Sequence, residues 1–474
     1  MNKDNIAIFD IESVGALHHW SSICEIGGVL VDKDLNEIDR FNLRCRLPEG
    51  EIPSAAACVV NKSDVNLLTK SNLSLYQMQS ELEKVIRKWT PAIFIGWSNT
   101  TFDDSMVQNS FFRGLRYPYQ MTSSPNKKHD GLKIAQGAYT VDNSIYKTEN
   151  TEKGNVSLSL PSLCRNNGID STGAHNALYD SILVQKILKL TKKKQPETWD
   201  LFLRTSSKSQ CETIIKKEKI FTLQETYYGK FYKFLVAPLH PNACIDIFRW
   251  GVACDLKVKV ENLIDLSVDD LRIQAKKLKL IRRIPLNKAP IILPESYGFQ
   301  QEPYNLIDKN IINKRAEMIK GNEEFSNKIL TILREAAEEK EKSKSQENVF
   351  AEQTINKFAS FKDSAIFPKW HSSDWNEKLR MLDKFEDERL VYFGKKIIFQ
   401  EAPDVLPKDM LKKMQIEIAE RILSDKEEKW MTCKEFYFEC DNQRERYSKD
   451  SKILKQLDEL NDHVMLIEKK YQNV

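Results

Sequence analysis

The stretch AIFDIES (residues 7–13) places two acids, Asp10 and Glu12, one residue apart in an apolar run that is typical of a β-strand. Because successive side chains of a strand point to opposite faces, both acids point the same way while Ile11 points into the packing. Carboxylates held this close repel each other unless one stays protonated or a divalent cation neutralises both. Alone, the pattern is more often the polar face of an edge strand, so its meaning depends on its neighbours.

The segments after this strand alternate between strand-like and helix-like patterns, which predicts an α/β domain with helices covering a sheet. The pattern runs through EIGGVLVD (25–32), LSLYQMQSELEKVIRKW (73–89), AIFIGW (92–97), DSMVQNSFFRGL (104–115) and ALYDSILVQKILKL (177–190). The charge run and proline of TKKKQPETWD (191–200) mark its end.

The rest of the chain has a different texture. From about residue 195 to 350, short β-like runs such as KFLVAPL (233–239) alternate with helices and proline turns, which predicts a mixed, barrel-like domain. A basic run at residues 276–288 fits a solvated charged face and a track for phosphates equally well. Beyond the charged stretch at 333–348, the remaining segments are helical with apolar stripes.

The composition is that of a soluble protein with several domains: 474 residues, 41% hydrophobic and 30% charged. A net charge of +4 gives only weak support for a polyanionic partner. The sequence has no long uncharged apolar run and no signal-peptide pattern at its start, so we expect a cytoplasmic protein with no membrane attachment. The nine cysteines form no C-x-x-C pair and are expected to be reduced and mostly buried.

A second acidic motif lies in IGWSNTTFDDS (residues 95–105), where a buried strand ends at Asn99, Phe102, Asp103 and Asp104 before a helix. Acids at this position, taken alone, more often cap the helix than bind a ligand. Either aspartate fits a ligand role, and the residues of this motif alone leave the choice open.

A third motif, GAHNALYDS (residues 173–181), has His175 five residues before Asp180. On one continuous helix the two side chains would lie about 140° apart. We therefore expect His175 in the loop before an Asn176 N-cap, and Asp180 facing the sheet from the helix. Taken singly, His175 is more often a surface residue and Asp180 a solvated helix acid.

Together, the order Asp-x-Glu, Asn-x-x-Phe-Asp, His-x4-Asp resembles the DEDDh exonuclease superfamily, whose fold is ribonuclease H-like. FDDSMVQNSFFRGLRYPY (102–119) and LPSLCRNNGIDSTGAHNALYDSILVQKIL (160–188) are similar to the bacterial exodeoxyribonuclease I family. FLVAPLHPN (234–242) and IPLNKAPII (284–292) look like that family's SH3-like middle domain, and NEKLRMLDKFEDERLVYFGKKIIFQEAPDVLP (376–407) resembles its C-terminal helical domain.

The resemblance implies a DEDDh exonuclease domain at residues 1–194, an SH3-like domain with helical insertions at 195–350 and a helical domain at 351–474. It implies a 3′-to-5′ exonuclease that degrades single-stranded DNA to 5′-mononucleotides in DNA repair and recombination. The alternatives are a 3′-to-5′ exoribonuclease, since such a metal site does not inspect the 2′-hydroxyl, or a non-catalytic protein that binds single strands. The three-domain length argues against the first, and retention of all five site residues against the second.

The resemblance also assigns roles to individual residues. Two Mg²⁺ ions about 3.5–4 Å apart would be bound by Asp10, Glu12, Asp103 and Asp180, and Mn²⁺ could replace Mg²⁺. His175 would be the general base. The implied partners are the 3′ ends of single-stranded DNA and the acidic C-terminal tail of single-strand DNA-binding protein, and the implied state is a monomer.

Substrate contacts are expected at Glu12, Gly15, Asn99, Phe102 and His175. Single-strand binding also needs basic and stacking side chains, for which the candidates are the run 276–288 and Tyr117, Tyr119, Phe248, Arg249 and Trp250. The chain departs from the family in two places. VVNKSD (59–64) stands where relatives have a Thr-Gly turn, and Asn176 replaces an aspartate, a change expected to be harmless if residue 176 caps the helix.

Overall fold

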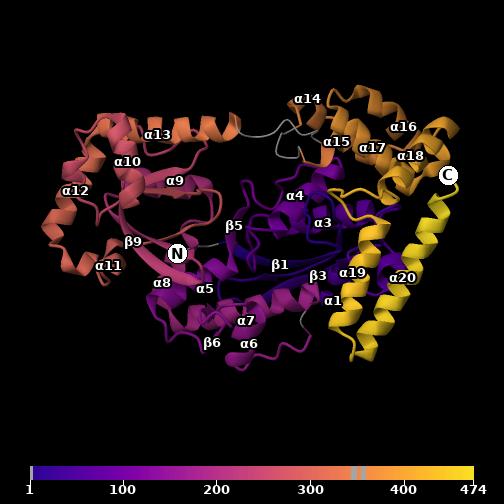
Figure 1. The fold of residues 1–474 in the computed structure, drawn as a ribbon, viewed down its shortest axis with the longest axis horizontal. Coiled ribbons are helices and arrows are strands. Elements are labelled where there is room, and N and C mark those ends of the chain that lie inside the picture. The colour runs from indigo at the N-terminus through magenta and orange to yellow at the C-terminus, as the bar shows by residue number, and fades with distance from the viewer. Residues whose placement is uncertain (1–3, 174, 343–349, 354–358) are drawn as a thin grey trace.

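The computed structural model describes residues 4–173, 175–342, 350–353 and 359–474. Its elements form a first region (β1 to α7), a middle region (α8 to α13) and a C-terminal region (α14 to α20). Figure 1 shows the middle and C-terminal regions at opposite ends of the molecule, with the sheet of the first region between them.

The first region is built around a five-stranded sheet in the order β3-β2-β1-β4-β5. Strands β1, β2 and β3 are antiparallel neighbours, whereas β4 and β5 run parallel to β1, so this region is α/β as predicted. The strands of this sheet are β1 (Asn5–Ser13), β2 (Ile23–Val31), β3 (Glu37–Arg44), β4 (Ala92–Gly96) and β5 (Lys127–Asp130), and β6 (Glu149–Asn150) and β7 (Val156–Ser157) form a separate two-stranded sheet. Its helices are α1 (Ala55–Val60), α2 (Val65–Lys70), α3 (Leu75–Trp89), α4 (Asp103–Arg113), α5 (Gly131–Val141), α6 (Leu160–Asn166) and α7 (Ala177–Lys194).

The side chains of β1 divide between two hydrophobic cores, as strand alternation requires. Ile6 and Ile8 pack with residues of α5 and α7 on one face of the sheet. Ala7, Phe9 and Ile11 pack with residues of α3 and α4 on the other face. Both faces of the central strand are therefore buried along most of its length, which holds the strand rigidly.

The middle region contains an antiparallel sheet in the order β11-β10-β9-β8-β12, covered by helices. Its strands are β8 (Phe221–Tyr227), β9 (Lys230–Pro238), β10 (Gly251–Asp255), β11 (Ile281–Ile284) and β12 (Ile291–Leu293). Its helices are α8 (Pro196–Leu203), α9 (Lys208–Lys217), η1 (Val260–Asn262), α10 (Val268–Leu278), α11 (Glu295–Gly298), η2 (Tyr304–Leu306), α12 (Lys309–Gly321) and α13 (Glu323–Lys342). Trp199, Phe202, Ile291 and Leu293 join the hydrophobic core beneath α7, which fastens this region to the first.

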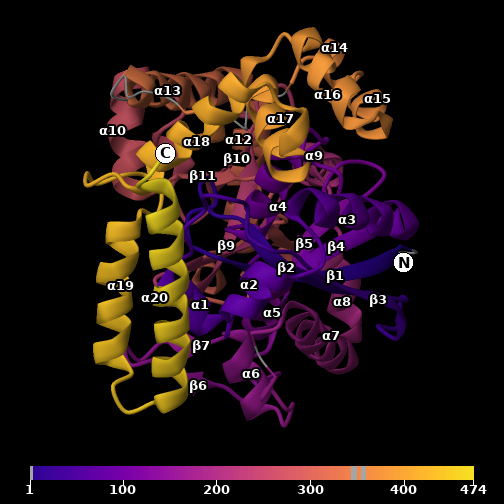
Figure 2. The same cartoon turned by 90° about the vertical axis from the view of Figure 1, so that its right-hand side faces the viewer.

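The C-terminal region is helical, as the apolar stripes predict. After η3 (Ala351–Gln353) it comprises α14 (Phe361–Ser364), α15 (Phe367–Ser372), α16 (Trp375–Met381), η4 (Leu382–Lys384), α17 (Glu388–Glu401), η5 (Pro403–Val405), α18 (Lys408–Ile422), α19 (Cys433–Arg446) and α20 (Ser451–Tyr471). It shares two cores with the first region: Phe112 packs with Phe393, and Ala55 belongs to the same cluster as Phe436. In Figure 2 the long α19–α20 hairpin lies beside α1.

All nine cysteines are buried and free, so the prediction that they are mostly buried is confirmed. Among the described residues, no helix is long and apolar enough to cross a membrane.

Candidate active site

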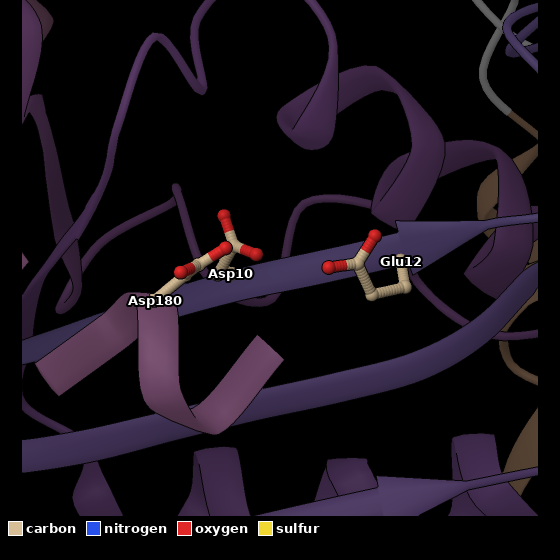
Figure 3. A group of neighbouring side chains, drawn as sticks. All are labelled: Asp10, Glu12 and Asp180. Carbon is tan, nitrogen blue, oxygen red and sulfur yellow. The ribbon is translucent and has the colours of Figure 1, made fainter. Parts of the chain in front are cut away.

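Three of the predicted acids lie together where β1 meets α7 (Figure 3). Asp10 and Glu12 continue the face of β1 that carries Ile6 and Ile8, and α7 brings Asp180 to that face. One oxygen from each of these three carboxylates lies within 4.8 Å of the others. The strand alternation predicted from the sequence is thus the direct cause of the cluster.

The start of α7 fixes the third acid and the candidate base. The Asn176 side chain caps the helix by accepting from the Tyr179 N–H at 3.1 Å, as predicted. His175 precedes the cap with φ of 69° and an exposed side chain, and its backbone N–H donates to Asp180 Oδ2 at 3.1 Å. The other carboxylate oxygen, Oδ1 of Asp180, is buried and has no hydrogen-bond partner among the described residues.

The neighbouring aspartates at the start of α4 have different surroundings. Asp104 is buried and accepts from Asn99 Nδ2 at 3.0 Å and from Lys128 Nζ at 2.8 Å. Asp103 does not belong to the 4.8 Å group, but its charge acts on both Asp10 and Glu12. Because Asp104 is occupied by structural partners, the geometry favours Asp103 as the fourth ligand, and that role stays a prediction.

Without a cation, the carboxyl groups of this cluster cannot all be ionised at neutral pH. Burial raises the pKa of Glu12 to about 8, and the nearby Asp180 adds to that rise. Burial also raises the pKa of Asp10 well above its usual range, reinforced by Asp103, and raises the pKa of Asp103 itself to about 7. A divalent cation removes this conflict by neutralising the carboxylates.

The residues present fit a hard divalent metal ion. The donor set consists of carboxylate oxygens only, the set preferred by Mg²⁺ and Mn²⁺. The unpartnered Asp180 oxygen and the raised pKa values of the acids are both relieved by such an ion. The acidic cluster is therefore a candidate site for divalent metal.

Sequence reasoning missed two charged residues beside the cluster. Glu25 lies opposite Glu12 in the β1–β2 pairing, is 4% exposed and is ion-paired with Arg44 at 3.1 Å. Lys62 follows α1 with φ of 54°, and its charge acts to lower the pKa of both Glu12 and Asp180. The strand predicted at EIGGVLVD contains Glu25, but the register of this strand against β1 cannot be read from the sequence. Lys62 lies in the VVNKSD segment singled out as a departure from the family.

The other expected substrate contacts have mixed surroundings. Gly15 is buried in the loop after β1, where its carbonyl accepts from Ser13 Oγ at 2.9 Å. Phe102 is half-buried at the N-cap position of α4 and packs against the core that contains α3. Asn99 is completely buried and holds Asp104. Substrate contact by these three residues stays a prediction.

The basic residues at 276–288 do not form one continuous basic surface. On β11, Arg282 is ion-paired with Asp255 at 3.2 Å and Arg283 with Asp246 at 2.5 Å, so both arginines serve the middle sheet. The exposed lysines that remain are Lys276, Lys277, Lys279 and Lys288.

The stacking candidates also differ in exposure. Tyr117 and Phe248 are 47% and 54% exposed, whereas Trp250 lies under the Arg283 guanidinium at 4.4 Å. Tyr119 is half-buried and contacts Tyr117, and the Arg249 side chain is exposed. Their contact with bases stays a prediction.

Comparisons with known proteins agree with this geometry. Residues 7–188 match the family model described as Exonuclease, and this span contains all five predicted active-site residues. The chain is 25% identical to exodeoxyribonuclease I of Haemophilus influenzae over 71% of this chain and 74% of the relative. It is 24% identical to exodeoxyribonuclease I of Buchnera aphidicola from Acyrthosiphon pisum, over 69% of this chain and 82% of the relative.

Solved structures extend the match over almost the whole chain. Exonuclease I from Methylocaldum szegediense matches with a TM-score of 0.80 at 19% identity, covering 98% of this chain and all of the other. Escherichia coli exonuclease I, solved in complex with a dA16 oligonucleotide, matches with a TM-score of 0.78 at 16% identity and the same coverage. The fold is shared, and the resemblance to bacterial exodeoxyribonuclease I is confirmed.

Proposed function

We propose that this protein is a 3′-to-5′ exonuclease that hydrolyses single-stranded DNA to 5′-mononucleotides. The observation that carries the proposal is the cluster of Asp10, Glu12 and Asp180, with Asp103 beside it, inside the span that matches the exonuclease family model. Further support comes from the relatives named exodeoxyribonuclease I and from the shared fold of an exonuclease I solved with an oligonucleotide.

The four acids would hold two Mg²⁺ ions, which Mn²⁺ can replace. Bound there, the ions would supply an activated water and stabilise the charge on the leaving 3′ oxygen. His175, exposed on the loop before α7, would accept the proton of the attacking water, a task that histidine performs more often than any other side chain. The bond from the His175 N–H to Asp180 would hold this loop beside the acids.

The remaining regions would guide the strand toward this site. We assign residues 1–194 to the exonuclease domain, 195–350 to an SH3-like domain with helical insertions and 351–474 to the helical domain. The exposed lysines of the run 276–288 would contact phosphates. A cytoplasmic monomer that acts in DNA repair and receives single strands from single-strand DNA-binding protein, by way of its acidic tail, fits this assignment.

A substrate comparison tests the proposal. The protein is incubated with Mg²⁺ and a single-stranded DNA, an RNA of the same sequence, or the duplex DNA, each labelled at the 5′ end. We expect single-stranded DNA to disappear first. Faster loss of the RNA would favour an exoribonuclease, and binding without loss of any substrate would favour a non-catalytic protein.

A further inference from the structure

The loop of residues 14–22 connects β1, which carries Asp10 and Glu12, to β2, and it includes Gly15. The last turns of α4 hold one side of this loop through its carbonyls. Asn109 Nδ2 donates to the His18 carbonyl at 2.6 Å, and Arg113 Nη2 donates to that of His19 at 2.5 Å. Because α4 begins at Asp103, one helix links this loop to the fourth candidate ligand.

The other side of the loop is held by residues from far along the chain. The Trp20 ring lies 5.5 Å from that of Phe350 and 5.4 Å from that of Trp430, and the last two rings are 5.5 Å apart. The Arg421 guanidinium lies over Trp20 at 5.1 Å and over Trp430 at 4.3 Å. We call these three rings with Arg421 the aromatic box.

A buried carboxylate ties the aromatic box to the loop. Glu352 is 4% exposed, and its Oε1 accepts from Arg421 Nη1 at 2.9 Å and from the Tyr392 hydroxyl at 3.0 Å. Its carbonyl lies 3.0 Å from His19 Nδ1. Although burial opposes ionisation, Lys396 and Arg421 lower the pKa of Glu352 to about 2, so the carboxylate stays charged at neutral pH.

Behind the loop, packing is incomplete. A cavity of about 450 Å³ lies between residues 14–22 and helices α17 and α18, and Trp20, Trp430 and Arg421 are among its lining residues. A loop beside an open cavity can shift without meeting a dense core. Its ends are held by the bonds from Ser22 to Glu51 and from the Ser54 N–H to the Val14 carbonyl. Between these ends, the loop is positioned by the contacts that α4 and the aromatic box make with residues 18–20.

We propose that the aromatic box positions the 14–22 loop, and with it the 3′ end of the strand, over the acidic cluster. Trp430 and Arg421, which lie more than 400 residues after β1 in the sequence, are then positioning residues for hydrolysis contributed by the C-terminal region. The inference rests on the proposed function for its substrate, whereas the anchoring of the loop does not. A misplacement of about 1 Å at the reacting atoms costs roughly a hundredfold in rate.

Trp430→Ala tests the proposal, with Phe438→Ala as the matched control, because Phe438 is a 72% exposed ring on α19 outside the aromatic box. Hydrogen exchange of the loop amides is measured without substrate. Steady-state rates are then measured on a short and a long single-stranded oligonucleotide. The exchange experiment needs no catalysis. If the wild-type protein proves inactive, the proposed function is refuted, and the exchange rates still test whether the aromatic box anchors the loop.

We expect Trp430→Ala to raise exchange in residues 14–22 about tenfold and to lower kcat about tenfold or more on both oligonucleotides. KM for the long strand and Mn²⁺ affinity should stay near wild-type values. Trp430→Phe should restore most of the rate, and Phe438→Ala should match the wild type. Unchanged exchange, or a rate loss confined to the long strand, would overturn the proposal.

If Trp430→Ala does not fold, His19→Ala serves as the second variant. His19 is only half-buried, and removing its side chain breaks the contact with the Glu352 carbonyl and the ring contact with His18, while the aromatic box itself stays intact. The same loop amides should exchange faster and kcat should fall on both oligonucleotides. Wild-type exchange in this variant would equally overturn the proposal.

Discussion

Replacing Glu12 with glutamine removes one of the crowded charges without changing the length of the side chain. Burial and Asp180 raise the pKa of Glu12 from 4.5 to about 8 in the folded protein. Below pH 4.5 the Glu12 carboxyl is protonated in both the folded and the unfolded protein. As pH rises toward the higher value, the unfolded chain releases the proton while the folded protein retains it, so the folded state loses stability, and above it the cost is complete.

A lone carboxyl with this shift would destabilise the folded protein by at most about 5 kcal/mol at high pH. The neighbouring acids titrate together with Glu12 and share that cost, so we expect Glu12→Gln to stabilise the metal-free protein by about 1–3 kcal/mol above pH 8. Near about pH 5 the two proteins should be almost equally stable, because Glu12 is then largely protonated when folded.

Urea unfolding in EDTA, followed by circular dichroism at about pH 5 and about pH 9, measures both differences. The exposed Glu152, changed to glutamine, is the matched control and should show neither. Added Mn²⁺ should reverse the order at the higher pH, since the wild type binds the ion more tightly. A variant less stable than the wild type at high pH, or a difference independent of pH, would refute the electrostatic argument.

Substitutions at four further residues separate the roles of neighbouring side chains. His175→Ala should lower kcat by roughly 10² or more with Mn²⁺ binding retained, and lost Mn²⁺ binding would contradict its assignment as the base. Asp103→Asn should abolish hydrolysis and, like Glu12→Gln, should not destabilise the metal-free protein, because burial raises the pKa of the Asp103 carboxyl as well. Asp104→Asn, in contrast, should cost about 2–3 kcal/mol in urea unfolding, because it leaves Lys128 poorly paired, yet keep Mn²⁺ binding. Lys62→Gly should have a free energy of unfolding about 0.5–1 kcal/mol higher than Lys62→Ala, because both variants lose the lysine charge beside Glu12 and Asp180 and only glycine relieves the positive φ.

Local patterns in the sequence predicted the parts of the site that depend on local geometry. Strand alternation placed Asp10 and Glu12 on one face, and the N-cap chemistry of Asn176 placed His175 in the loop before α7. Both rules act over a few residues, so a single sequence contains all that they need.

What the sequence could not predict depends on long-range pairing. Asp104 is fixed by Lys128 on another strand, and Glu25 reaches the site only through the register of β2 against β1. Trp20 contacts Trp430, which lies some 400 residues later in the chain, and no local sequence pattern predicts this contact. Nor could the basic run reveal that Arg282 has acidic partners in the middle sheet.

The most direct test of the central claim is a time course on a single-stranded oligonucleotide labelled at its 5′ end. In Mg²⁺ the account predicts a ladder of labelled strands that shorten one nucleotide at a time from the 3′ end, and no shortening in EDTA or with Asp10→Asn. Cuts inside the strand, loss of the labelled 5′ nucleotide first, or full activity of Asp10→Asn would contradict it.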